Sequence, residues 1–322
     1  MSEQKSDKTL LSIITPAYNE SANLALLHAA LSAALDPSGQ PWEWVIVDDH
    51  SADGTFEKIR QMAQQDPRIV GIRLARNSGS HTAIACAMHH ARGDCAVVMA
   101  ADLQDPPDTI PLLLEKWRAG NQVVWAAREQ REGEKLSVTG FSRLYYFIMR
   151  HIVGLKELPA TGADFFLIDR AVLDAADRFT EQHVNIFALI TWMGFRQTTI
   201  HYAKQARIHG ASGWNFEKKI KLVVDSITSF TYLPIRLMSY GGIGAAFLGF
   251  LYALFVIIHA LRGSPVSGWS SLMVVVLVMG GLQMIMMGIL GEYLWRALDE
   301  SRRRPRFIIE ETVGRDPREA SR

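Results

Sequence analysis

Short apolar runs alternate with amphipathic stretches along the first part of the chain. The apolar runs predict strands at 11–15, 44–47, 69–74, 96–100 and 123–126. The stretches between them predict helices at 21–35, 55–65, 82–91 and 109–119. Strands and helices in alternation indicate an α/β fold with a doubly wound, mainly parallel sheet. In such a sheet, ligands bind beyond the carboxyl ends of the strands.

Two long stretches nearer the end of the chain, 237–261 and 263–291, contain no Asp, Glu, Lys or Arg. Each is longer than the roughly 20 helical residues that span the apolar core of a bilayer. We therefore expect a two-helix transmembrane hairpin, because a pair of buried core helices rarely needs uncharged runs of this length. Glycines recur in both stretches and permit close helix contact, within the hairpin or in a homo-oligomer.

Basic residues flank the outer ends of this hairpin. Those before it are Lys218, Lys219, Lys221 and Arg236, and those after it are Arg296, Arg302, Arg303, Arg304 and Arg306. The connecting loop offers only Arg262. By the positive-inside rule, both ends of the hairpin face the cytoplasm. The pattern predicts a multi-pass protein of the inner (plasma) membrane, with its large N-terminal domain and both termini cytoplasmic.

Two segments, 141–153 and 214–233, mix aromatic with basic side chains. Either pattern suits a core-packing helix or a helix in the lipid headgroup region, and directly before a membrane span we favour the interface. We expect, in order, a flexible N-terminus, a cytoplasmic domain, amphipathic juxtamembrane helices, two transmembrane helices and a basic cytoplasmic tail. Their expected ranges are 1–9, 10–213, 214–236, 237–295 and 296–322.

The composition argues against several classes of protein. With 48% hydrophobic and 21% charged residues, the chain is too apolar to be disordered over most of its length. Its formal net charge of +1 provides no excess of cations for phosphate backbones, so we expect no nucleic-acid partner. The two cysteines, Cys86 and Cys95, suit neither a disulfide framework nor a zinc site.

Acidic residues gather directly after three of the predicted strands. They are Glu20 after the first, Asp48, Asp49 and Asp53 after the second, and Asp102 and Asp105 after the fourth. Asp53 or Asp108 alone is explained as a helix N-cap, but a cap accounts for only one acid in each loop. Carboxylates crowded at one crevice repel each other unless a cation or hydrogen-bond donors occupy it. Because glycine-rich phosphate loops are absent from the sequence, a metal held on carboxylates is the expected partner of any phosphates.

These loops carry motifs that resemble the family 2 glycosyltransferases with the A-type fold, specifically the polyprenyl-phosphate glycosyltransferases. The matching segments are PAYNE at 16–20, DDHSADGT at 48–55, RNSG at 76–79 and DLQDPP at 102–107. Taken in order with the terminal hairpin, they are far more specific than any one alone. The resemblance extends from about residue 10 to the basic tail.

The resemblance implies an inverting transferase that moves a sugar from a nucleotide sugar, first of all UDP-glucose, to undecaprenyl (polyprenyl) phosphate at the cytoplasmic membrane face. GDP-mannose and UDP-N-acetylhexosamine remain alternative donors. A catalytically impaired, membrane-anchored sugar-nucleotide binding protein is the alternative from another class. A processive polysaccharide synthase is more distant, because the sequence lacks a Q-x-x-R-W motif and further membrane helices.

The same resemblance assigns roles to residues. The expected nucleotide-binding residues are Pro16, Tyr18, Glu20, Asp48, Asp49, Asp53 and Asp102. Asp48 or Asp49 would recognise the base and ribose. Asp102, also expected to be catalytic, and Gln104 would hold Mg²⁺ or Mn²⁺, since hard oxygen ligands suit these ions. Asp164 is the expected catalytic base or acceptor-positioning residue, with a loop cap as its structural alternative.

Holding an anionic acceptor beside an anionic donor calls for cations, and the candidates for the acceptor phosphate are Arg128, Arg131 and Arg207. The first two also fit an ordinary solvated surface, because glutamates are interleaved with them. Three positions depart from the common family pattern. Relatives often carry Asp, Arg and Lys where this chain has Ala100, Phe166 and Gly213. We therefore expect a looser metal site, completed by water and substrate phosphate or by another carboxylate, and an acceptor site with fewer or rearranged cations.

Overall fold

The computed structural model describes residues 9–128, 147–152, 154–155, 157, 159, 164–181, 185–203, 205, 228, 230–262 and 268–314. The chain divides into two compact units. The first comprises residues 1–226 together with 305–322, and the second comprises residues 227–304. The first unit is thus interrupted in sequence by the second.

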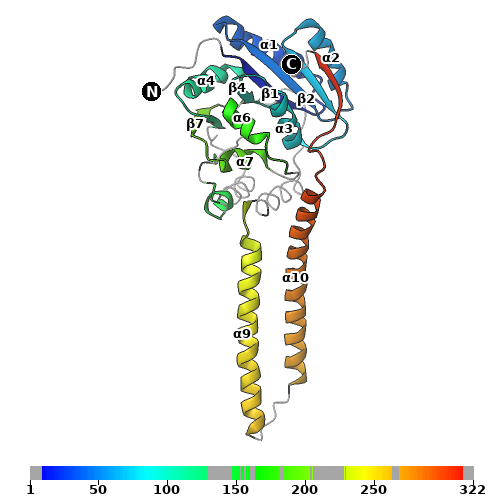
Figure 1. The fold of residues 1–322 in the computed structure, drawn as a ribbon, viewed down its shortest axis with the longest axis vertical. Coiled ribbons are helices and arrows are strands. Elements are labelled where there is room, and N and C mark those ends of the chain that lie inside the picture. The colour runs from blue at the N-terminus through cyan, green and yellow to red at the C-terminus, as the bar shows by residue number, and fades with distance from the viewer. Residues whose placement is uncertain are drawn as a thin grey trace. The chain divides into compact units, whose positions relative to one another are not determined.

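The first unit is built on an eight-stranded sheet, with strand order β7-β5-β6-β4-β1-β2-β3-β8 (Figure 1). The strands are β1 Leu11–Ala17, β2 Trp42–Asp48, β3 Ile69–Leu74, β4 Cys95–Val98, β5 Val123–Arg128, β6 Phe165–Asp169, β7 Gln197–Tyr202 and β8 Ile309–Gly314. Only β6 and β8 pair antiparallel with their neighbours in this sheet. The predicted α/β fold with a mainly parallel sheet is confirmed.

Helices cover the sheet on both faces, as the alternating pattern predicts. They are α1 Leu24–Leu35, α2 Thr55–Gln65, α3 Ser80–His90, α4 Ile110–Arg118, α6 Arg170–Ala176 and α7 Ile186–Trp192. Shorter elements are the 3₁₀ helices η1 Asp36–Ser38 and η2 Pro107–Thr109 and the π-helix η3 Ile148–Ile152. The four predicted helices agree with α1 to α4 within three residues at each end. The five predicted strands agree with β1 to β5 to the same degree.

The core forms where the apolar faces of these elements meet. In β2, Trp44 and Ile46 point to one face and Val45 and Val47 to the other, and all four are fully buried. A strand covered on both sides has to be apolar at successive positions, which is why β2 lacks a clean alternation. Burial of each such side chain stabilises the fold by about 1.5–3 kcal/mol.

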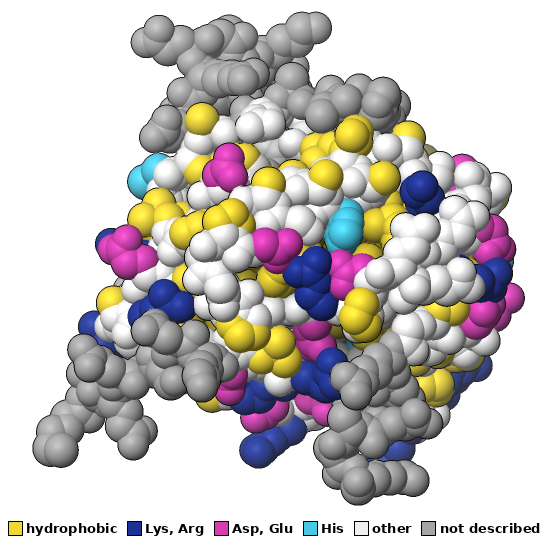
Figure 2. All heavy atoms as spheres, turned by 90° about the horizontal axis from the view of Figure 1, so that it is seen from above, with side chains coloured by type: hydrophobic (Ala, Val, Ile, Leu, Met, Phe, Trp, Pro, Cys, Tyr) yellow, Lys and Arg dark blue, Asp and Glu magenta, His cyan; other side chains and the backbone are white. Residues whose placement is uncertain are grey.

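Figure 2 shows that acidic and basic side chains are interspersed on the face of the molecule seen from above. This distribution accords with the near-zero formal net charge of the whole chain.

The second unit contains two long apolar helices, α9 Leu233–Leu261 and α10 Trp269–Ser301. By length and composition, their segments Leu233–His259 and Leu272–Ser301 are suited to cross a membrane. Many of their large side chains, such as Phe247 and Leu277, are exposed. Apolar surface of this extent is unfavourable in water. The two membrane-length helices that the sequence predicts are thus present in the structure. Most of the expected juxtamembrane helices at 214–236 and most of 141–153 lie outside the described residues.

Candidate active site

The loops that follow β1, β2 and β4 meet at one edge of the sheet, because parallel strands end on the same side. The backbone N–H of Asn19 donates to Ser51 Oγ at 2.8 Å, and the N–H of Ala52 donates back to Asn19 Oδ1 at 3.1 Å. Each loop turns through a residue with left-handed backbone: Asn19, His50 and Leu103 have φ of 57°, 60° and 60°. Such conformations cost energy outside glycine and concentrate at functional sites.

Asp49 fixes the start of α3. Its two carboxylate oxygens accept the backbone N–H groups of Ser78 at 2.7 Å and Gly79 at 2.8 Å. Burial raises the pKa of Asp49, and these two hydrogen bonds partly offset that effect. The carboxylate is therefore already engaged by the protein backbone.

Asp48 has a different environment, although it is the next residue in sequence and is fully buried. Its carboxylate accepts the N–H of Ser51 at 3.2 Å and lies 3.8 Å from Nε of Arg73 on β3. Burial raises the pKa of Asp48, and the hydrogen bonds from Ser51 and the charge of Arg73 oppose the rise. The structure thus separates two acids that the sequence left as alternatives.

Asp53 links the loop after β1 to the start of α2. Its carboxylate accepts the N–H of Thr55 at 3.0 Å and both the N–H and the hydroxyl of Ser21, at 3.2 Å and 2.9 Å. Burial alone would raise its pKa, but the hydrogen bonds from Thr55 and Ser21 outweigh burial and lower it. Asp53 is not the N-cap of α2, since that position is Gly54, but its carboxylate ties the loop after β1 to the first residue of the helix.

The end of β1 presents the remaining residues expected at the nucleotide. Tyr18 is 51% exposed, so its ring offers an open aromatic surface at the loop edge. Pro16 is half-buried within β1. The carboxylate of Glu20 accepts a hydrogen bond from the Asn23 side chain, and its backbone N–H donates to Thr55 Oγ1 at 2.9 Å. Glu20 therefore also holds the loop to α2.

The loop after β4 carries the expected metal ligands. Asp102 is 6% exposed and accepts the N–H of Gln104 at 3.1 Å, while the Gln104 carbonyl accepts the N–H of Gln205 after β7 at 2.9 Å. Among the described residues, no group of three or more His, Cys, Asp or Glu side chains is arranged to hold a metal. The side chain of Ala100 offers no oxygen donor to this loop. The carboxylate of Asp102 and the amide oxygen of Gln104 are hard donors that fit Mg²⁺ or Mn²⁺ when substrate oxygens and water complete the shell.

Two residues to which the sequence analysis gave separate roles lie together at the β5 and β6 end of this edge. Asp164 directly precedes β6 and Arg128 ends β5, and the antiparallel register of Ala126 with Phe165 brings these ends together. Arg128 Nη2 lies 3.8 Å from Asp164 Oδ2, and both side chains are about 40% exposed, at 40% and 39%. A cation and a carboxylate thus stand side by side at the surface. Arg131, Arg207 and Gly213 lie outside the described residues.

Phe166 points away from this pair. It is fully buried, and its ring lies 4.9 Å from the ring of Trp125 and 5.8 Å from that of Phe187. The side chain serves the core on the face of β6 opposite to Phe165. Phe166 therefore contributes no group to the candidate site.

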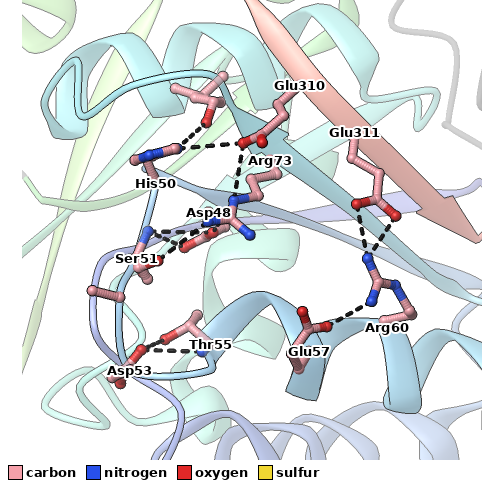
Figure 3. Close-up of polar contacts among 12 residues, drawn as sticks. Asp48, His50, Ser51, Asp53, Thr55, Glu57, Arg60, Arg73, Glu310 and Glu311 are labelled. Carbon is pink, nitrogen blue, oxygen red and sulfur yellow. Dashed lines mark hydrogen bonds and ion pairs between the residues drawn. The ribbon is translucent and has the colours of Figure 1, made fainter.

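The sequence analysis missed two contributions to this edge. Tyr202, the last residue of β7, donates a hydrogen bond to the fully buried Asp105. Glu310 on β8 lies 3.1 Å from Arg73 Nε and 3.4 Å from His50 Nδ1 (Figure 3). Neither carries a motif, and Glu310 is more than two hundred residues from its partners in sequence. Only strand pairing could reveal it.

Comparison with known proteins agrees with the motifs. Residues 12–176 match the model of glycosyl transferase family 2. An uncharacterized glycosyltransferase of Bacillus subtilis (strain 168) is 35% identical over 304 residues, which cover 94% of each chain. A bactoprenol glucosyl transferase of Shigella phage SfV is 31% identical over 300 residues, covering 93% of this chain and 97% of that one. Mannosyl-3-phosphoglycerate synthase from Rubrobacter xylanophilus has a TM-score of 0.49 at 16% identity, over 72% of this chain and 75% of that one. The family match and these two relatives show that the chain belongs to glycosyl transferase family 2.

Proposed function

We propose that this glycosyltransferase moves a hexose, with glucose of UDP-glucose as the first choice, to undecaprenyl (polyprenyl) phosphate at the cytoplasmic face of the membrane. The observation that carries the proposal is the Arg128–Asp164 pair, 3.8 Å apart at the same sheet edge as the nucleotide loops. Support for the acceptor comes from the phage relative, whose name is bactoprenol glucosyl transferase. The two membrane-length helices provide access to such a lipid.

On the donor side, Tyr18 and the loop that begins at Asp48 meet the nucleoside, while Asp49, Asp53 and Glu20 keep these loops in shape through the hydrogen bonds described above. Pro16 shapes the end of β1 beneath them. Asp102 and Gln104 would hold Mg²⁺ or Mn²⁺ against the diphosphate. When bound, the ion neutralises the charge that grows on the departing nucleoside diphosphate.

On the acceptor side, Arg128 binds the lipid phosphate, joined by Arg131 and Arg207. A phosphate monoester has a second pKa of about 6, so at neutral pH the acceptor is already largely anionic and needs little proton abstraction. Asp164 therefore acts mainly by orienting Arg128 and the acceptor. An acceptor oxygen forms its bond to the anomeric carbon as the bond from that carbon to the diphosphate breaks on the opposite face. This in-line displacement inverts the configuration and produces a β-linked product.

The connectivity of the chain bears on the membrane topology. After α10 the chain returns to the first unit, where β8 pairs with β3. If α9 and α10 both cross the membrane, the segments before and after them lie on one side of it. The arginines that follow the uncharged run indicate that this side is the cytoplasm. We therefore place the sheet unit and both termini in the cytoplasm.

Transfer to a lipid is tested directly with membranes that contain the full chain. They are incubated with labelled UDP-glucose, undecaprenyl phosphate and Mg²⁺ or Mn²⁺, with GDP-mannose and UDP-N-acetylhexosamines in parallel. We expect a chloroform-soluble labelled product that EDTA abolishes and that Asp102→Ala reduces at least a hundredfold. Asp108→Ala is the matched control, because this acid is exposed at the next turn, η2. Nucleotide binding without product from any donor would instead favour a non-catalytic binding protein.

A further inference from the structure

The last described strand contains a bulge that brings two neighbouring acids to one face. β8 pairs with β3 through Glu311 opposite Arg73 and Ile309 opposite Leu74, so Glu310 is an extra residue in the ladder. In a regular strand, neighbouring side chains point to opposite faces, and a bulge re-aims one of them. Here both carboxylates reach arginines on the same side: Glu310 meets Arg73 and Glu311 meets Arg60 (Figure 3).

Glu310 contacts two residues that border the candidate nucleotide site. Its Oε2 lies 3.1 Å from Nε of Arg73 and 3.4 Å from Nδ1 of His50. The same Nδ1 of His50 lies 3.0 Å from the carbonyl oxygen of Leu74, which leaves the ring held between β3 and β8. Arg73 Nε is in turn 3.8 Å from the carboxylate of Asp48. A single residue, Arg73, therefore links Glu310 to Asp48.

The charges in this chain of contacts alternate in sign, from Glu310 through Arg73 to Asp48. Asp48 is fully buried, where a carboxylate is costly without a nearby cation. Arg73 supplies that cation, but its long side chain has several rotamers and needs a partner to hold it. Glu310 is 48% exposed and approaches Arg73 from the solvent side. Its carboxylate supplies such a partner, 3.1 Å from Arg73 Nε.

We infer that Glu310 is a positioning residue for the nucleotide sugar: by holding Arg73 and His50, it keeps the loop between β2 and α2 in the shape that binds the nucleoside. The inference rests on the proposed function, which assigns this loop, beginning at Asp48, to the nucleotide. The strand that carries Glu310 follows the second membrane-length helix in sequence. A strand that follows the hairpin in sequence thus supports the donor loop.

The docking of β8 does not depend on Glu310. Arg60 Nη2 donates to both carboxylate oxygens of Glu311, at 2.7 Å and 2.8 Å. Val313 packs over Gly71, where an added Cβ would lie 2.7 Å from Val313 Cγ2 and 2.2 Å from Ile59 Cγ2. The N–H of Ala75 donates to the carbonyl of Ile308 at 2.9 Å. Removing the charge of Glu310 should therefore leave the strand in place.

The test compares Glu310→Gln with Glu311→Gln in the full chain, purified in detergent. UDP binding is measured by calorimetry, and the unfolding midpoint by heating. We expect Glu310→Gln to weaken UDP binding by about threefold to fivefold, the upper part of the range for one partly exposed charge contact. In the transfer assay, the same variant should raise the KM for the UDP-sugar and leave kcat unchanged. Glu311→Gln, the control, should bind UDP within twofold of the wild type, even where its unfolding midpoint falls.

Equal UDP binding by the wild type and Glu310→Gln would overturn the inference, and so would an equal loss in both variants. If the wild type binds neither UDP nor GDP, the inference and the proposed function both fail. If the wild type binds UDP but makes no lipid product, the proposed transfer fails, while the binding comparison still decides the role of Glu310.

Discussion

The hydroxyl of Tyr202, at the end of β7, donates a hydrogen bond to the buried carboxylate of Asp105, in the loop after β4. This contact fastens the loop that carries Asp102 and Gln104 to the strand that pairs with β5. Burial and the adjacent negative charge of Asp105 raise the pKa of Tyr202 well above its usual value, so the hydroxyl stays protonated and remains a donor. The candidate metal loop and the Arg128 side of the site are thereby joined.

Replacement of Tyr202 by Phe should therefore loosen this loop. Loss of a hydrogen bond to a buried carboxylate costs about 1–3 kcal/mol of folding stability. We expect a lower unfolding midpoint for Tyr202→Phe in detergent and a lower transfer rate. Thr199→Val, an exposed position on the same strand, is the control and should change neither. Unaltered stability of Tyr202→Phe would show that the hydrogen bond is not important for the loop.

Substitutions at Arg128 and Asp164 should weaken acceptor binding and leave donor binding unchanged. Since Arg128 is assigned to the lipid phosphate, Arg128→Gln should raise the KM for polyprenyl phosphate at least tenfold and leave the KM for the nucleotide sugar within twofold. Asp164→Asn should also raise the KM for polyprenyl phosphate, because the neutral side chain no longer orients Arg128 by charge. Initial rates at varied concentrations of each substrate measure both effects. Arg178→Gln, on the exposed surface after α6, is the control, and a change confined to the donor KM would contradict the assignment.

Asp66 gives a prediction for the dependence of stability on pH. Hydrogen bonds from Arg68 are the main cause that lowers its pKa well below the ordinary value, with a further hydrogen bond from His28. A carboxyl whose pKa is lower in the folded state stabilises the fold above its unfolded pKa of about 3.9, and this contribution is lost as the pH falls toward the folded pKa.

Asp66→Asn should accordingly cost about 1–2 kcal/mol at pH 7, an amount that allows for the partial exposure of Arg68. The gap in unfolding midpoint between this variant and the wild type should be narrower at pH 3 than at pH 7. Asp108→Asn provides the comparison, because Asp108 lies exposed in η2. A gap that is constant between the two pH values would argue against an ionised Asp66 as the source of the stability.

Local patterns were sufficient for the regular elements near the start of the chain. β1 to β5 and α1 to α4 follow from apolar periodicity, since each of these elements needs an apolar face against its neighbours. β8 was different, and its range fell within the segment predicted to be a basic tail. Its residues are short of apolar side chains, and most of them are exposed. An edge strand of this kind becomes a strand only by pairing, here with β3.

The sequence by itself determined the α/β class, the two membrane-length helices and the acidic loops that follow the parallel strands, because these depend on residues close together in the chain. It did not distinguish Asp48 from Asp49, and it did not bring Arg128 to Asp164 or Glu310 to Arg73. Those relationships were decided by strand order, by antiparallel register and by one bulge. Each of these is a property of backbone pairing between distant segments, and no pattern within either segment encodes its partner.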